Sequence, residues 1–419
     1  MASAIYERSF SGNLPLKLAA QMKYEVLKQT FWGRFAKFNN IGQDVRKAHP
    51  GNEPQPILSP VVIQHELERK QGDEIHVPML RNLKYLPKVG TAQMEGYEEK
   101  LYMNFARVPI DILRHAYDPQ EGIMMTQVTK DYQLLERYNP ILTRHYARTS
   151  DLLQCTYALL RGYSYNILAS NRFTGNAKIK AISHPNVFIA GQGQIPVSGS
   201  NYPGTAGWET DLGTAVNLVA NTHVFNTAFL NALKASKTIQ KIDPLIMKDG
   251  NPYWLVIVHP YQIANLEADP AFQALSNSVL VQNLAKENPI LVGARYFYGG
   301  FAIFVTDQAV WPVRRNAVSG RIEYGPATVT DLDSYENYSA DTKFAACVIG
   351  NNALFKATGK PLEYKKRMAD YDEIIGIAYR TVEGYSRADY FNEDDGTWGQ
   401  YVRNFGSALA ITWAEEPAF

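Results

Sequence analysis

The sequence lacks several features that define a function quickly, and cysteine is the first of them. Only two cysteines, Cys155 and Cys347, occur among 419 residues, and both lie in segments that read as buried. Two distant cysteines of this kind are typical of small core side chains in a reducing compartment. A disulfide framework is therefore not predicted.

An excess of charge of one sign is also missing. The chain has 42 lysines and arginines against 41 aspartates and glutamates, so no global field exists to hold nucleic acid. A dedicated DNA-binding function is excluded, and contact with DNA is expected to be weak or confined to patches. The first twenty residues lack the layout of a signal peptide, and no apolar run reaches the roughly twenty residues of a membrane helix. We expect a protein that remains in cytosol-like solution, with no membrane partner.

Motifs that carry chemistry are absent as well. His65-Glu66 has no second histidine one turn later, and the eight histidines are scattered singly, so no metal site is predicted. Gly191-Gln-Gly193 lacks both the third glycine of a dinucleotide turn and the lysine of a phosphate loop. No glycine-flanked serine elbow occurs, and neither cysteine has a basic neighbour that would activate it. The sequence therefore nominates no catalytic residue, no cofactor and no metal ligand.

The sequence does contain a pair of strand-like segments joined by a long polar connecting segment. Asp73–Leu80 and Glu99–Val108 each carry apolar residues at a period of two, which is typical of strands with one apolar face. The eighteen residues Arg81–Glu98 between them exceed any ordinary hairpin turn. Because an isolated two-stranded ribbon is only marginally stable in water, we expect the ribbon to lie on a neighbouring copy of the chain.

Helices are predicted on both sides of this ribbon. Asn13 can cap an amphipathic helix with Pro15 in its first turn, and the proline-rich segment 39–60 should be extended. Asp118-Pro119 starts a second helical region, and Pro140 is expected to divide it because proline cannot donate inside a helix. The later of the two helices should be about thirty residues long. Its apolar stripe is Leu142, Tyr146, Leu153, Tyr157, Leu160 and Ile167.

The rest of the chain alternates loops and apolar strands. Segment 171–211 is rich in glycine, serine and proline and reads as a boundary or a loop layer. After a helix at 222–235 come three wholly apolar runs, which predict a central sheet covered on both faces. Short helical turns are expected after Pro260 and Pro270, and two long strands near the C-terminus. The apolar runs are Tyr253–Val258, Phe301–Val305 and Phe344–Ile349, and the long strands are Leu362–Arg367 and Glu373–Val382.

Five stretches together carry a family resemblance. They are Val62–Val77, Met94–Leu101, Arg114–Tyr117, Pro252–Pro260 and Tyr371–Tyr385. In this order and spacing they resemble a tailed-bacteriophage major capsid protein of the Hong Kong 97 fold. The resemblance implies an α+β protein with an N-terminal arm, an extended β-hairpin loop, a long spine helix, a split peripheral domain and an axial domain.

The same resemblance implies a division of the chain. Residues 1–60 would be the arm, 61–110 the extended loop with the start of the peripheral domain, and 111–211 the peripheral domain with the spine helix. Residues 212–355 would be the axial domain, and 356–419 the returning peripheral strands and the C-terminal tail. For residues 1–60, a helix folded back on its own domain remains the alternative.

The function implied is a structural subunit that forms pentamers and hexamers of an icosahedral shell around packaged double-stranded DNA. Its partners would be further copies of itself and portal, scaffold or decoration proteins. It would reside in the virion after assembly in the host bacterial cytoplasm. An encapsulin-like compartment shell protein, and an enzyme whose site is assembled from distant residues, are the alternatives.

Two sets of surface residues are candidates for this function. The tip of the ribbon offers polar contacts to a neighbour: Lys84, Lys88, Glu95 and Glu98. A basic run, Lys365, Lys366 and Arg367, could face the packaged DNA on the inner surface. A solvated strand edge protected by lysine explains the same run without any ligand.

Overall fold

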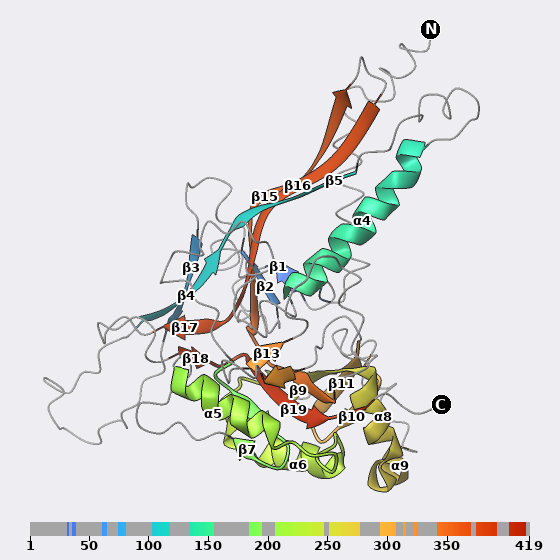
Figure 1. The fold of residues 1–419 in the computed structure, drawn as a ribbon. Helices are drawn as coiled ribbons and strands as arrows, with labels where there is room; N and C mark the ends of the chain where they lie inside the picture. The colour runs from blue at the N-terminus through green and yellow to red at the C-terminus, as the bar shows by residue number, and fades with distance from the viewer. Residues whose placement is uncertain are drawn as a thin grey trace, which may run out of the picture.

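A computed structural model describes the central and C-terminal parts of the chain in most detail. The residues it describes are 32, 36–38, 61–64, 74–80, 103–117, 134–154, 184–194, 206–246, 251–276, 294–306, 313–315, 322–324, 342–369, 374–391 and 402–415. An elongated sheet with a helix alongside it forms one half, and a sheet enclosed by several helices forms the other (Figure 1).

The elongated half is built on two long strands. Strands β15 (Leu354–Ala369) and β16 (Ile374–Arg387) pair antiparallel along most of their length. They confirm and extend the two long strands predicted near the C-terminus. The full five-stranded order is β1-β2-β15-β16-β5, with β1 (Ala36–Phe38), β2 (Val61–Gln64) and β5 (Asp111–Tyr117).

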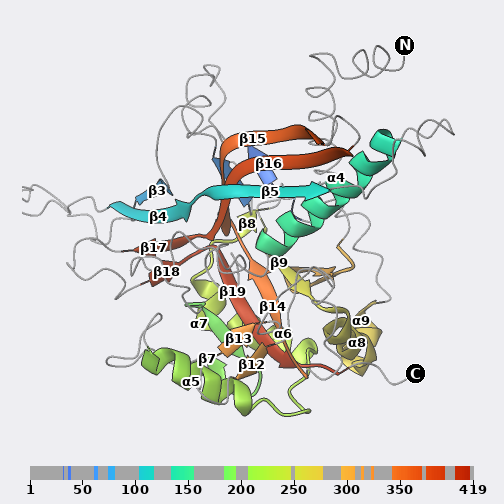
Figure 2. The same ribbon diagram turned by 45° about the horizontal axis from the view of Figure 1, so that its top comes forward.

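The predicted ribbon exists as a pair of strands. Strands β3 (Glu74–Leu80) and β4 (Met103–Pro109) are antiparallel, in a register that joins Glu74 to Pro109 and Leu80 to Met103. Two short strands, β17 (Asp389–Phe391) and β18 (Val402–Asn404), extend them to the four-stranded order β18-β17-β4-β3. The ribbon projects to one side of the molecule in both views (Figures 1 and 2). Its tip, residues 81–98, lies outside the described residues.

The enclosed half is a mixed sheet in the order β10-β11-β9-β14-β19-β6-β7, with β8 beside β9. Alternate residues of its strands enter two different clusters: Leu255 and Ile257 face one way, and Val256 and Val258 the other. This burial on both faces confirms the predicted central sheet. The bounds are β6 (Val187–Ile189), β7 (Gly193–Gln194), β8 (Leu245–Ile246), β9 (Pro252–Val258), β10 (Tyr296–Tyr298), β11 (Phe301–Val305), β14 (Lys343–Ile349) and β19 (Ser407–Trp413).

Helices supply the cover on each face. Trp208, Leu212 and Val216 of α5 (Ala206–Asn217) join the cluster on one side. The opposite cluster takes apolar residues from α6 (Thr227–Ala235), α7 (Lys237–Gln240), α8 (Pro260–Ala268) and α9 (Pro270–Ser276). A small hairpin of β12 (Val313–Arg315) and β13 (Ile322–Tyr324) lies against α5. The helical turns expected after Pro260 and Pro270 are confirmed, whereas α5 begins inside the segment read as loop.

Helix α4 (Leu134–Leu152) differs from the prediction at Pro140, which lies inside it instead of dividing it. Proline removes only its own hydrogen bond, to the carbonyl of residue 136. Pro140 is exposed and sits in the second turn, so this loss and the ring's steric demand fall near the helix end. Leu142, Tyr146 and Leu153 of the predicted stripe are buried. Tyr157, Leu160 and Ile167 lie outside the described residues, as does the predicted helix at Asn13.

The C-terminal apolar segment has a larger role than a tail. β19 pairs antiparallel with β14 over seven residues and parallel with β6 on its other side, so it occupies the middle of the sheet. The sheet therefore combines strands from residues 187–194, 245–349 and 407–413. The chain passes from this sheet into the elongated half through β15 and β16, and returns through β17 and β18.

Candidate functional site

Two buried polar networks fix how the parts of the molecule are joined. The first lies between α4 and the elongated sheet. The Tyr146 hydroxyl donates to Glu383 Oε1 at 2.7 Å, and Lys356 Nζ lies 3.2 Å from Glu383 Oε2. The Lys356 ammonium also lies 5.1 Å from the Tyr385 ring centroid, and Ser150 Oγ is 2.9 Å from the Tyr385 hydroxyl. The helix is thereby held in one position along the strands.

The charges in this network depend on one another. Burial alone would lower the pKa of Lys356, but the Glu383 carboxylate together with Tyr146 and Asp151 more than offsets this effect, so the pKa is raised and the lysine stays protonated. Burial, and then the negative Glu383, raise the pKa of Tyr146 well above its usual value. The Glu383 side chain is only 2% exposed, so the ion pair is enclosed and removal of one partner would leave a buried charge.

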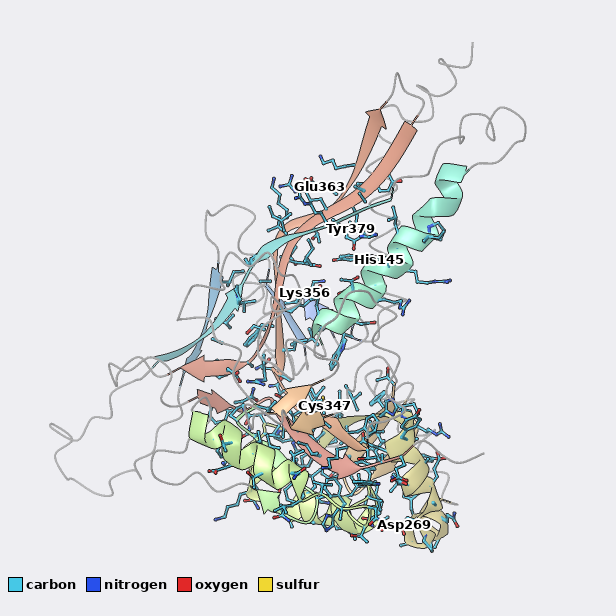
Figure 3. The ribbon with its side chains drawn as sticks, in the orientation of Figure 1. His145, Asp269, Cys347, Lys356, Glu363 and Tyr379 are labelled. Atoms are coloured by element: carbon cyan, nitrogen blue, oxygen red, sulfur yellow. The ribbon has the colours of Figure 1, made fainter. Side chains whose placement is uncertain are left out.

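A pair of stacked histidines lies further along the same contact. The rings of His115 on β5 and His145 on α4 are 4.0 Å apart and nearly parallel, and His145 Nδ1 is 3.1 Å from the Tyr379 hydroxyl. Figure 3 shows His145 and Tyr379 between the helix and the sheet. Burial, then His115 and Arg148, lower the pKa of His145 to about 4. The His145 imidazole is therefore neutral near neutral pH.

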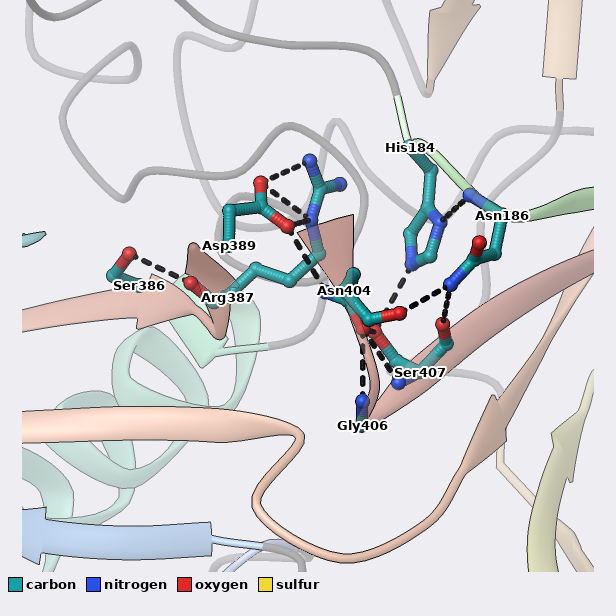
Figure 4. A network of polar contacts seen from close by, with 8 residues as sticks. All are labelled: His184, Asn186, Ser386, Arg387, Asp389, Asn404, Gly406 and Ser407. Atoms are coloured by element: carbon teal, nitrogen blue, oxygen red, sulfur yellow. Dashed lines mark hydrogen bonds and ion pairs between the residues drawn. The ribbon is translucent and has the colours of Figure 1, made fainter. Parts of the chain in front are cut away.

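The second network joins the elongated half to the enclosed sheet (Figure 4). Arg387 has no exposed surface and binds Asp389 through Nε and Nη2, with the shortest contact at 2.6 Å. The Asn404 amide donates to Asp389 Oδ1 at 2.9 Å, while Asn404 Oδ1 accepts from the main-chain nitrogens of Gly406 and Ser407. One continuous set of hydrogen bonds thus links the end of β16 to the start of β19.

His184 and Asn186 complete this network from the segment before β6. His184 Nδ1 accepts from the Asn186 main-chain nitrogen at 3.1 Å, so Nε2 carries the proton and donates to Ser407 Oγ at 3.0 Å. Burial, and then the nearby Arg387, lower the pKa of His184 well below its usual value. The Asn186 amide donates to the main-chain oxygens of Asn404 and Ser407.

These networks position segments and offer no reactive centre. Ser407 and His184 form a serine–histidine pair, but both are essentially buried, and Ser407 is also held against Asn404, so no substrate could reach the hydroxyl. Cys347 is a free thiol in the core, which confirms the structural interpretation of that residue; Cys155 lies outside the described residues. No cluster of three potential metal ligands occurs among the described residues. Within the same residues, no helix is long and apolar enough to cross a membrane.

The surface residues proposed from the sequence are only partly described. Lys84, Lys88, Glu95 and Glu98 lie outside the described residues. Lys365 is exposed on β15 and lies 3.4 Å from Glu363. Lys366 and Arg367 follow on the same strand, opposite Ile377 and Gly376 of β16. Neither set is brought into a site by the described structure.

Sequence reasoning missed the buried charges altogether. Lys356, Glu383, Arg387 and Asp389 lie outside the two long strands that were predicted, Leu362–Arg367 and Glu373–Val382. Charged residues next to aromatic ones, as at Glu383 and Tyr385, are the signal that could have drawn attention to them, because a charge on a covered strand requires a partner. One partner of Glu383, Tyr146, comes from a segment 237 positions away.

Comparison with known proteins shows which family the chain belongs to and which solved structures have a similar fold. Residues 55–414 match the model of a family described as phage capsid protein, and the chain belongs to that family. The capsid of Ralstonia phage GP4 is similar in structure, with a TM-score of 0.61 at 17% identity over 86% of this chain and 89% of that one. No match was found among curated protein sequences.

Two further solved structures are similar. The cyanophage Pam1 capsid has a TM-score of 0.55 at 14% identity, covering 86% of this chain and 90% of that one. The acidic stable capsid of Helicobacter pylori bacteriophage KHP30 has a TM-score of 0.52 at 12% identity, covering 90% and 98%. At these identities the likeness shows the fold, which is the α+β, Hong Kong 97-like fold expected from the sequence.

Family and fold together identify the class of function. The chain is a phage major capsid protein, a self-assembling structural component of the virion and not an enzyme. The resemblance seen in the sequence is thereby confirmed. Neither the enzyme alternative nor the encapsulin-like alternative receives support.

Proposed function

We propose that the chain forms pentamers and hexamers that close into the icosahedral shell around the double-stranded DNA genome of a tailed bacteriophage. The observation that carries this proposal is the family match over residues 55–414, supported by the likeness of the fold to whole capsid subunits. Symmetric closure lets many modest contacts give a stable shell without one strong interface. Assembly would take place in the host bacterial cytoplasm, with portal, scaffold or decoration proteins as further partners.

The ribbon is the proposed intersubunit arm, together with residues 1–60. Its root is anchored in its own chain, where Ile75, Val77, Ala106 and Val108 are buried in one cluster with Phe355, Ala357 and Tyr390. The root thus provides a fixed base for the segment that carries Lys84, Lys88, Glu95 and Glu98. These four side chains would make polar contacts with the neighbouring subunit.

In this proposal the chain divides by function as well. The extended loop and the start of the peripheral domain would be residues 61–110. The rest of the peripheral domain would be residues 111–211 together with 356–419. The axial domain, which meets its copies around a capsomer centre, would be residues 212–355. The two polar networks support a fixed geometry between these parts, since each is buried and hydrogen-bonded on several sides.

Contact with the genome would be weak and non-specific. The formal net charge of +1 gives no overall attraction for DNA, and Lys365, Lys366 and Arg367 would supply a few screened phosphate contacts. We therefore expect reversal of these three charges to leave assembly of empty shells intact.

The test of the function is to shorten the ribbon. Residues 81–98 are replaced by Asn-Gly, which together with residues 99–102 leaves a short connection of six residues between the paired Leu80 and Met103, and the unaltered chain is the control. We expect the shortened chain to unfold at an unchanged temperature, because the tip contributes little to the buried root, but to form no regular particles in negative-stain images. Normal particles from the shortened chain would exclude the arm. Failure of the unaltered chain to form particles or rings would exclude the shell.

A further inference from the structure

The five-stranded sheet has a second face, opposite α4, whose charges are not balanced. Successive residues of a strand point to opposite faces. Because Tyr379 and His115 face the helix, the next residues, Arg380 on β16 and Arg114 on β5, face away from it. They are direct partners in the strand register, and Glu363 on β15 is the partner of Arg380 on its other side. In Figure 3, Glu363 lies on the side of the sheet away from the helix.

Within the part of the chain that the structure describes, neither arginine has an ion-pair partner. Arg380 Nε is buried and lacks a hydrogen-bond partner, and no ion pair reaches either arginine from the described residues. A buried N–H group without an acceptor is costly, and like charges directly across a strand pair destabilise a sheet. Sheets avoid such pairs unless another group compensates for them.

Glu363 does not provide full compensation. Its carboxylate is engaged by Lys365, two residues along the same strand, at 3.4 Å. The face therefore carries the positive charges of Arg114, Arg380 and Lys365 against one negative charge. It also carries apolar surface, since Ile112 is 43% exposed; the half-buried Val382 opposite it packs partly against the cluster at the root of the ribbon.

We propose that this face, consisting of Ile112, Arg114, Glu363, Arg380 and Val382, docks onto a second copy of the chain. A carboxylate of that copy would lie between the two guanidinium groups. The inference rests on the proposed shell function, because a shell places a second copy of the chain next to each subunit. It adds one specific contact to that function. We call this surface the arginine face.

The composition of the arginine face favours a protein partner. Arginine is enriched in protein interfaces, its planar fork matches a carboxylate in a bidentate arrangement, and exposed isoleucine gains by burial against another protein. A nucleic acid would bring phosphates towards Glu363 as well as towards the arginines, and would leave Ile112 without an apolar partner. A chain with 41 carboxylates and a net charge near zero offers the complementary charge itself.

The test uses two single substitutions in the full chain, Arg114→Gln and Arg380→Gln. Lys241→Gln is the matched control, because Lys241 is an exposed cation next to α7 in the enclosed half. Thermal unfolding is measured on dissociated subunits, and the lowest concentration that yields particles is measured by light scattering and negative-stain microscopy. Binding of a short duplex DNA to the dissociated subunits is measured at physiological salt.

We expect both arginine variants to unfold at the parent temperature or above, since repulsion across the strands is relieved. We expect them to need at least about tenfold higher concentration to assemble, the loss typical of an unpaired charge at an interface. The control should behave like the parent in both assays. The inference would be overturned if both variants assembled at the same concentration as the parent chain. It would also be overturned if the parent chain bound duplex DNA and the two variants did not.

A further outcome separates this contact from a role within the subunit. If Arg380→Gln destabilises the dissociated subunit, Arg114→Gln still decides the question, because Arg114 is exposed on an edge strand. Normal assembly of that variant would then show that the pair serves the chain's own fold. If the parent chain itself forms no particles, the shell function is refuted. The parent chain therefore distinguishes failure of the shell function from failure of the proposed contact.

Discussion

Replacement of Gly384 by alanine should change the direction of the ribbon. Gly384 lies in β16 where the chain passes from β4 into β5 at Pro109 and Ile110. A Cβ atom on Gly384 would lie 1.8 Å from the main-chain oxygen of Pro109 and 3.2 Å from Ile110 Cα. Both neighbours are main-chain atoms, so no side-chain rotation can make room.

The size of the effect follows from these distances. Ordinary van der Waals contact begins near 3.4 Å, so the Pro109 oxygen must move by 3.4 minus 1.8, or 1.6 Å. Overpacking of a core costs about 1–3 kcal/mol where side chains can adjust, and a shift of main chain lies at or above the upper end. We therefore expect Gly384→Ala to lower the free energy of unfolding by about 3 kcal/mol.

Gly359→Ala is the matched control in the neighbouring strand. Its Cβ would lie 3.1 Å from a methyl group of Val382, which can shift by a few tenths of an ångström. The assay is thermal unfolding of the dissociated subunit with hydrogen exchange of β4 and β5, followed by particle yield. Gly384→Ala should lose protection at the corner and fail to assemble, whereas Gly359→Ala should do neither. Equal stability and equal particle yield for the two variants would refute the reasoning.

Two further perturbations test the polar networks. Asp389→Asn should leave the fully buried Arg387 without a counter-charge and lower the free energy of unfolding by about 3–5 kcal/mol in chemical denaturation; a loss below 1 kcal/mol would contradict the assigned pairing. The pKa of His145 is about 4 in the folded chain and 6.5 in a model peptide, so the unfolded state binds more protons between these values. Stability from this group is complete above pH 6.5 and is lost as the pH falls towards 4. His145→Gln should therefore reduce the fall in unfolding temperature between neutral and acidic buffer, and an unchanged fall would exclude His145 as its source.

The strands were predictable where the pattern is local. A period of two in the ribbon limbs and unbroken apolar runs at Tyr253–Val258 and Phe344–Ile349 are properties of a few adjacent residues, and both signals correspond to strands. The starts of α8 and α9 were predictable for the same reason, since a proline follows a capping residue at His259 and Asp269.

Features decided by distant contacts could not be read from the sequence. Helix α5 has an unremarkable composition and is specified by the burial of Trp208, Leu212 and Val216 against the sheet. The central position of β19 depends on pairing with β14 and β6, which no local pattern records. The arginine face was missed because Arg114 and Arg380 become neighbours only through the register of β5 and β16.

The position of β19 has a consequence for how the protein is made. Of the described strands, β19 is the last to leave the ribosome, yet β14 and β6 meet only through it. Until Ser407–Trp413 has been synthesised, the sheet lacks its middle strand, and the hydrogen bonds that join Ser407 to His184 and Asn404 in the second network cannot form. A nascent chain whose β19 is still within the ribosome therefore cannot present a finished subunit to its neighbours, so Ser407–Trp413 must be synthesised before a subunit can join a growing shell.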